Sequence, residues 1–175
     1  MDGRSRVMIY SLVIGLTFVA KAYGQHNTDQ TRASLRGLKG VYVSVHYDAP
    51  PEAKYGLTEK DLRDEIELRL DVDGVPVLTK GKWVDSEGQP YLYVNVVGTN
   101  VLSNGKKLDL FFYTFNMGLI QRVKVERPPY LTCDACTWSQ GYSAIVPKEE
   151  LRTIAVRLGD LASEFAHAVK AANAK

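Results

Sequence analysis

Alternation of apolar and polar residues predicts several β-strands in this chain. Between Val41 and Tyr47, every second residue is apolar and the residues between them include Ser44 and His46. A period of two indicates a strand with one buried face. The same period recurs at 91–97, and 108–115 is expected to be its partner strand. Asn104-Gly105 between them is typical of a hairpin turn because both residues tolerate positive φ. Further strands are expected at 75–78, 119–126 and 142–146, with a chain reversal at 116–118.

Two other segments carry the spacing of three and four that is typical of an amphipathic helix. Thr58 is a predicted N-cap with Asp61 at the capping-box position, and the apolar spacing that follows predicts a helix over 59–70. Asp73-Gly74 is expected to close this helix. The longer pattern runs from Leu151 to Ala172 and predicts a C-terminal helix.

The order of these elements is strand, helix, strand, a meander of strands, a short strand and a helix. This order predicts an α+β fold, with a mainly antiparallel sheet of about five strands and two helices packed on one face. The helices are expected to cover the side that carries Val41, Val43 and Val45. Residues 37–175 are expected to form one domain, and the polar stretch 25–36 is expected to be a flexible lead-in.

The first 24 residues have the layout of a secretory signal peptide. Arg4 and Arg6 precede an apolar run at 7–20, and Ala22-Tyr23-Gly24 is a small-residue cleavage pattern. A run of about fourteen residues is shorter than the roughly 20 that span a bilayer as a helix. We therefore expect cleavage after Gly24, a secreted or periplasmic protein, and no stable membrane insertion after cleavage.

The leader also accounts for the charge of the chain. The whole sequence has 22 basic and 20 acidic residues and a formal net charge of +2. The leader contains three basic residues and one acidic residue, so the remainder has equal numbers of each. A basic excess that is discarded with the leader does not indicate nucleic-acid binding, and none is expected.

Cys133 and Cys136 form a C-x-x-C pair that is expected to be a disulfide outside the reducing cytosol. A thiol-disulfide redox pair and two free thiols are the alternatives. Covalent haem attachment is not expected, because Thr137 stands where a histidine is needed. A zinc site would need two further ligands that the sequence does not supply nearby. We therefore expect neither a metal nor another cofactor.

No catalytic motif is present. The sequence contains no Gly-x-Ser-x-Gly elbow, no phosphate-binding glycine-rich loop and no H-E-x-x-H motif. His46 is a lone histidine on a predicted strand, and Ser143 has no assigned base. We expect a non-enzymatic protein, and the Cys133/Cys136 redox pair is the enzymatic alternative.

The sheet face opposite the helices is expected to be rich in aromatic residues, and an uncovered face of this kind often marks a binding site. One alternative is that the sheet curls, or that the loop 80–89 with Trp83 folds over these rings, to make a second small core. Another is a homo-oligomer that buries the face against a copy of itself. The residues expected on this candidate binding face are Tyr42, His46, Tyr91, Tyr93, Phe111, Tyr113 and Phe115.

Residues 38–98 have a distinctive apolar spacing and set of turns, carried by Gly40-Val41-Tyr42-Val43, by 56–62, by Gly74-Val75-Pro76-Val77 and by 90–96. In this they resemble a pattern in small uncharacterised bacterial secreted proteins. More distantly, they resemble the strand-helix-strand-strand core of the TolB N-terminal domain and of CsgG-like envelope proteins. The resemblance implies a periplasmic binding or envelope-assembly accessory domain, whose partner is an envelope protein or a small apolar ligand.

Overall fold

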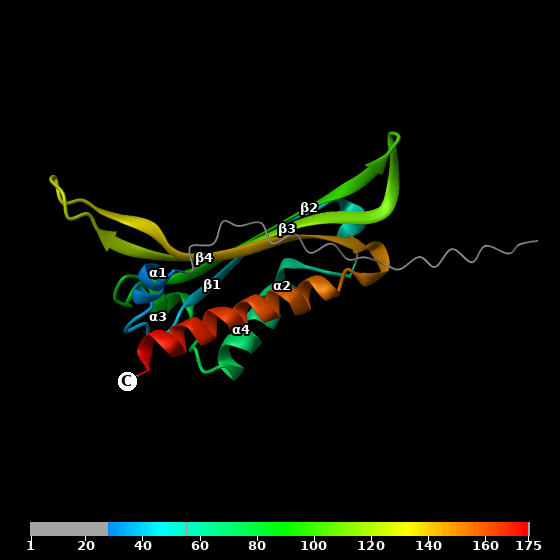
Figure 1. The fold of residues 1–175 in the computed structure, drawn as a ribbon. Coiled ribbons are helices and arrows are strands. Elements are labelled where there is room, and N and C mark those ends of the chain that lie inside the picture. The colour runs from blue at the N-terminus through cyan, green and yellow to red at the C-terminus, as the bar shows by residue number, and fades with distance from the viewer. Residues whose placement is uncertain (1–27, 55, 175) are drawn as a thin grey trace, which may run out of the picture.

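The computed structural model describes residues 28–54 and 56–174, so the expected leader lies outside the described residues. Its four-stranded sheet has the order β1-β2-β3-β4, and two main helices, α2 and α4, pack together on one face (Figure 1). β1 is parallel to β2, whereas the β2–β3 and β3–β4 pairs are antiparallel. The strands are β1 (Tyr42–Asp48), β2 (Tyr91–Ser103), β3 (Lys106–Lys124) and β4 (Thr132–Pro147).

Helix α2 (Glu59–Val72) begins and ends as its sequence predicts. The Thr58 hydroxyl accepts a hydrogen bond from the backbone N–H of Asp61, and the Asp61 carboxylate accepts one from the backbone N–H of Thr58. This reciprocal pair is a capping box that satisfies two backbone donors. At the other end, Gly74 has a φ of +73°, which favours glycine after a helix.

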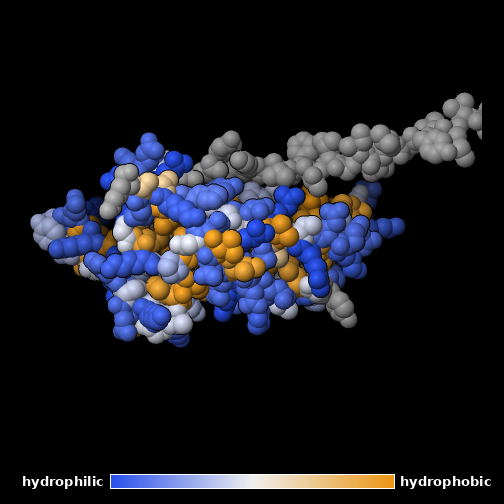
Figure 2. All heavy atoms as spheres, turned by 90° about the horizontal axis from the view of Figure 1, so that it is seen from below, coloured by the Kyte–Doolittle hydropathy of each residue, from blue (hydrophilic) through white to orange (hydrophobic). Residues whose placement is uncertain are grey.

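The helix layer covers one face of the sheet, as expected. Leu62, Ile66 and Leu70 of α2 are fully buried, together with Leu158 and Phe165 of α4 (Thr153–Asn173). They pack with the buried valines of β1 and β2 in one hydrophobic core. Figure 2 views the molecule from the helix side, where hydrophilic residues predominate and apolar residues form separate patches. The α+β class and the placement of both helices are therefore confirmed.

The sheet has four strands rather than about five, because two strand boundaries were predicted wrongly. The expected reversal at 116–118 does not occur, and β3 runs through it for 19 residues. Met117 and Leu119 are both buried and continue the core-facing alternation of the strand. Residues 119–126 therefore mostly extend β3, and β4 begins at Thr132 rather than near Tyr142. The expected strand at 75–78 contributes only an isolated bridge between Val77 and Val41.

The segment expected to be a flexible lead-in is structured where it is described. Residues 28–36 contain the short helix α1 (Asp29–Ala33), capped by Thr28, and Leu35 is fully buried. The Asn173 side chain at the end of α4 donates to the Leu35 carbonyl (3.0 Å) and accepts from the Gly37 N–H (2.7 Å). Ser34 adds two more contacts, since its hydroxyl donates to the Thr137 carbonyl and its carbonyl accepts from the Gln121 side chain. The polar sequence concealed this docking, because one apolar side chain and a few hydrogen bonds anchor it.

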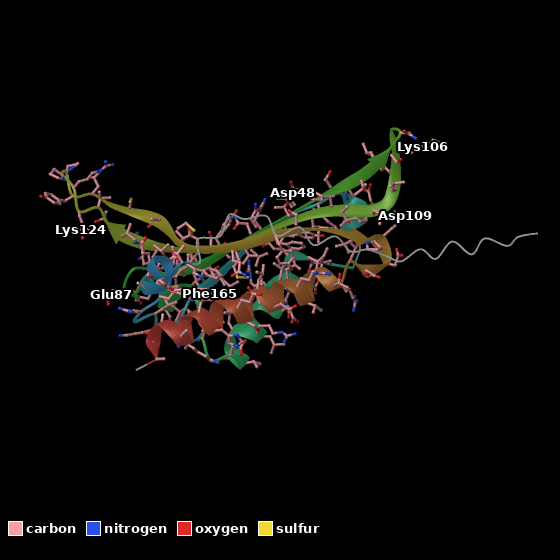
Figure 3. The ribbon with its side chains drawn as sticks, viewed as in Figure 1. Asp48, Glu87, Lys106, Asp109, Lys124 and Phe165 are labelled. Carbon is pink, nitrogen blue, oxygen red and sulfur yellow. The ribbon has the colours of Figure 1, made fainter. Side chains whose placement is uncertain are left out.

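Both hairpins of the sheet extend beyond the helix layer and bend away from it (Figure 1). Figure 3 shows Lys106 and Lys124 toward the two outer ends and Phe165 on the side of α4 that faces the sheet. Asn104 and Gly105 have φ values of +50° and +76°, as a tight hairpin turn requires. Glu52 accepts a hydrogen bond from Lys107 (2.6 Å), and this contact lowers the Glu52 pKa to about 2. Because both hairpins bend away from the helix layer, the helix-free side of the sheet is concave.

Gly98 allows a buried aromatic ring to lie against β2. Gly98 pairs with Tyr113 across the sheet, and a Cβ at Gly98 would lie 2.5 Å from the Tyr113 ring. This position places the Tyr113 hydroxyl 3.3 Å from that of Tyr47, which in turn donates to the Ala53 carbonyl at 3.1 Å. Burial raises the pKa of Tyr113, so this hydroxyl stays protonated.

We expect Gly98→Ala to lower the free energy of unfolding by about 1–3 kcal/mol, because the added methyl group overpacks the Tyr113 site. Urea denaturation followed by circular dichroism measures the change. Gly81→Ala is the matched control, since a Cβ at Gly81 meets nothing within 4 Å. Equal urea midpoints for the two variants would contradict the proposed contact.

Candidate functional site

The sheet face opposite α2 and α4 brings side chains from all four strands into rows. His46, Asn95, Asn116 and Gly141 lie side by side across β1, β2, β3 and β4. Parallel rows lie on either side of this one, because residues two apart on a strand share a face. We define the open face as Ser44, His46, Asp48, Tyr93, Asn95, Val97, Phe112, Thr114, Asn116, Gly118, Ser139, Gly141, Ser143 and Ile145.

The structure divides the aromatic residues that were expected to share one face. Tyr93 is 38% exposed on the open face, and His46 lies near it on β1. The expectation is wrong for Phe111, Tyr113 and Phe115, which are buried beneath the helices at 2% exposure or less. The odd-numbered positions of β3 from 111 to 119 are all large and apolar, whereas the even positions include threonine, asparagine and glycine. Burying the odd set removes more apolar surface from water.

Trp83 covers the two remaining tyrosines. Helix α3 (Lys80–Val84) places its indole ring 5.5 Å from the Tyr42 ring and 5.9 Å from the Tyr91 ring. The Trp83 indole N–H donates to the Gln89 carbonyl at 2.7 Å, which fixes the ring. The alternative expectation, that the loop 80–89 folds over aromatic rings, is therefore confirmed for Tyr42 and Tyr91.

The open face is polar and uncharged at its centre. Asn95 and Asn116 are paired across β2 and β3, and Thr114 and Ser143 are paired across β3 and β4 with their hydroxyls 3.4 Å apart. Amide and hydroxyl groups both donate and accept hydrogen bonds. Apolar side chains lie toward the β2–β3 hairpin, where Val97, Phe112 and Ile145 are each 40–41% exposed.

Acidic, basic and imidazole side chains lie at the margins of this surface. His46 and Asp48 are on β1, the strand at one edge of the sheet. Arg122 and Asp134 are at the base of the β3–β4 hairpin, with the guanidinium nitrogen 3.7 Å from the carboxylate. The face can therefore hydrogen-bond to a partner at its centre and select the partner's charge at its rim.

Two hollows near the open face are small. One of about 200 Å³ lies over Gly141, and one of about 260 Å³ lies between Trp83 and the Arg122–Asp134 pair. Both are below the roughly 300 Å³ at which small-molecule pockets begin. A larger, open hollow of about 910 Å³ lies between the β2–β3 hairpin and η2 (Lys148–Glu150), and its Glu52 is already paired with Lys107. The small hollows suit single side chains of a larger partner.

The expected disulfide does not form. Cys133 and Cys136 are both exposed and free, three residues apart on the extended strand β4. Three residues of strand span about 10 Å, whereas disulfides join Cα atoms about 4.4–6.8 Å apart. The two thiols also point to opposite faces of the sheet. Although Cys136 is exposed as a residue, its sulfur lies against Gly118 and is partly buried, and this desolvation raises the pKa of the Cys136 thiol and disfavours the thiolate that a redox pair needs.

The other sequence candidates are not assembled into a catalytic site. His46 is on β1 and Ser143 on β4, so three strand spacings of about 4.8 Å separate them. Within the described ranges, no carboxylate or histidine hydrogen-bonds to the Ser143 hydroxyl. The same residues contain no cluster of three His, Cys, Asp or Glu side chains suited to a metal ion. Among the helices of the described part, none is long and apolar enough to cross a membrane.

Neither a protein-family model nor a curated protein matches the sequence. The functional argument therefore rests on the open face itself. Sequence reasoning placed Ser44, His46, Tyr93 and Asn95 on this surface but missed the asparagine, serine and threonine residues that β3 and β4 contribute. The even-numbered positions of β3 were the available signal, because they are the less apolar set of a strand with one buried face.

We expect both cysteines to be reduced in native protein purified without a reductant. Iodoacetamide should then add two labels per chain, as measured by intact mass. Cys136 should react more slowly than a model thiol, and its rate should keep rising at a pH where an ordinary thiol has levelled off, because its pKa is raised. Cys133→Ser isolates the Cys136 reaction. Labelling that appears only after reduction would contradict the free-thiol structure.

Proposed function

We propose that this protein is a non-enzymatic binding domain that holds a polypeptide partner against its open face. The observation that carries the proposal is a concave sheet surface, four strands wide, that neither main helix covers. Its residues include one tyrosine, two asparagines, three serines, one threonine and two glycines, and the apolar residues Val97, Phe112 and Ile145 lie toward one end. Under this proposal the helices serve to hold the sheet in shape.

Exposure of apolar groups on this face supports a partner. Tyr93, Val97, Phe112 and Ile145 are each 38–41% exposed and occupy neighbouring strands. Apolar side chains gathered on one surface favour association, because their burial releases water. The helix layer also exposes apolar residues, Leu68 and Val72 on α2 and Val156 on α4, but these lie on two helices and not on adjacent strands of one sheet.

The chemistry of the face fits a polypeptide better than a nucleic acid. Tyrosine supplies rigid contact area, and serine, glycine and asparagine supply adaptable hydrogen bonds, which is the composition of protein-binding antibody loops. No lysine or arginine is among the residues that define the open face. A phosphate backbone would need such cations for affinity.

The expected export of the chain indicates where the partner is found. A secreted or periplasmic protein shares its compartment with other envelope proteins. The resemblance of residues 38–98 to envelope-assembly domains implies the same class of partner. We therefore propose an envelope protein as the ligand, bound through an extended or irregular segment that follows the concave face.

Affinity capture from the envelope fraction of the source cells tests this proposal. We expect the protein to retain a partner, and Tyr93→Ala/Asn116→Ala to reduce its recovery by about tenfold or more, because an exposed aromatic and a central amide are lost together. Leu68→Ala is the matched control, since it removes an apolar side chain that is 56% exposed on α2.

The circular dichroism spectra of both variants should match that of the wild type. Equal recovery of the partner by the wild type and the open-face variant would contradict the proposal. Loss of recovery in Leu68→Ala alone would place the binding surface on the helix layer instead.

A further inference from the structure

The outer edge of β4 is a second surface that the proposed function does not use. β4 is the last strand of the sheet and is 16 residues long. A strand at the edge of a sheet presents unpaired N–H and C=O groups that can pair with another chain. Among the described residues, helix α1 contacts this strand near Thr137, whose carbonyl accepts from the Ser34 hydroxyl at 3.3 Å.

Hydrogen-bond directions identify which backbone N–H and C=O groups of β4 point away from β3. The Arg122 N–H is donated to the Gly88 carbonyl, on the β2 side of β3. Because backbone direction alternates along a strand, odd-numbered β3 residues such as Phe115 and Met117 bond toward β4. Their β4 partners, Tyr142 and Gln140, use their backbone groups in this ladder. The residues that direct N–H and C=O groups outward are Ser139, Gly141, Ser143 and Ile145.

Residues 139–145 of this edge lack the features that normally prevent strand pairing, because the β-bulge of β4 is at Thr137 and lies before them. Asp134 is the only charged residue of β4, and its only proline is the last residue, Pro147. Natural edge strands are usually short or protected by charges, prolines or bulges. The opposite edge follows that rule, because β1 has seven residues, contains Asp48 and is followed by Pro50 and Pro51.

We propose that two copies of this chain pair antiparallel through residues 139–145 of β4, about a two-fold axis that relates the two Tyr142 residues. In this register Ser139 lies opposite Ile145 of the other copy, and Gly141 lies opposite Ser143. All four outward-directed residues of each chain then exchange backbone hydrogen bonds, about eight in total. The edge is therefore complementary to itself, as a two-fold interface requires.

Charges do not oppose this arrangement. The paired segments are uncharged. On the helix side, Glu164 of α4 accepts a hydrogen bond from the Gln140 side chain, and Asp160 and Arg157 lie about one and two turns before it on the same helix, so both signs of charge are present beside β4. A second copy brings the same mixture, and opposite charges can pair across the axis.

The dimer would join two open faces into one continuous surface of eight strands. This inference goes beyond the proposed function, because the edge and the open face are different surfaces. A partner could bind the open face of the monomer or of the dimer. Partner binding and pairing through β4 can therefore fail separately.

Light scattering after size exclusion tests the dimer, using protein expressed from the full sequence. We expect a mass twice that of one chain. Ser143→Pro should weaken the dimer by about tenfold or more, because it removes an outward N–H on each copy and sets a ring against the incoming strand. The same change spares the β3–β4 ladder, so folding should persist. Ser143→Ala keeps the N–H and should remain a dimer.

Hydrogen exchange of the wild type supplies a second measurement that needs no variant. In the dimer, the amides of Ser139, Gly141, Ser143 and Ile145 should be as protected as those of Gln140, Tyr142 and Ala144. A monomeric mass with fast exchange at the four outward amides would overturn the proposal. A dimer that Tyr93→Ala disrupts and Ser143→Pro does not would also overturn it, by placing the contact on the open face.

Discussion

The alternation of side chains along β3 is the constraint on which the rest of this structure depends. β3 is 19 residues long and pairs with a strand on each side, so its pleat sets the facing of β2 and β4 as well. Phe111, Tyr113 and Phe115 enter the core under the helices, and their neighbours Phe112, Thr114 and Asn116 must then face the other way. The open face is the necessary counterpart of this core.

The same alternation controls the backbone at the sheet edge. On β4, the residues that place side chains on the open face are also those that direct N–H and C=O groups outward, with Ser143 as one example. A partner on the open face and a second copy at the edge would therefore contact the same stretch of chain through different groups. Side-chain chemistry would select the partner, and backbone geometry would set the register of the dimer.

Local chemistry made much of the fold predictable. The capping box of Thr58 and Asp61 and the Asn104-Gly105 turn each depend on a few neighbouring residues, and both were confirmed. Features that depend on tertiary context were not predictable in this way. Asn116 and Gly118 indicate a turn when read alone, yet they lie within β3, where the buried side chain of Met117 between them holds the strand in the sheet. The Cys133/Cys136 spacing allows a disulfide in a loop but not on an extended strand.

Hydroxyl-radical footprinting tests most directly the claim that the sheet has one covered and one open face. Tyr93, Phe112 and Ile145 should be oxidised in the free protein, because each is 38–41% exposed. Phe111, Tyr113 and Phe115 should remain unmodified under the same dose, because the helix layer excludes solvent from them. Oxidation of Tyr113 at a rate similar to that of Tyr93 would contradict the account, since it would mean that β3 presents its aromatic residues to solvent.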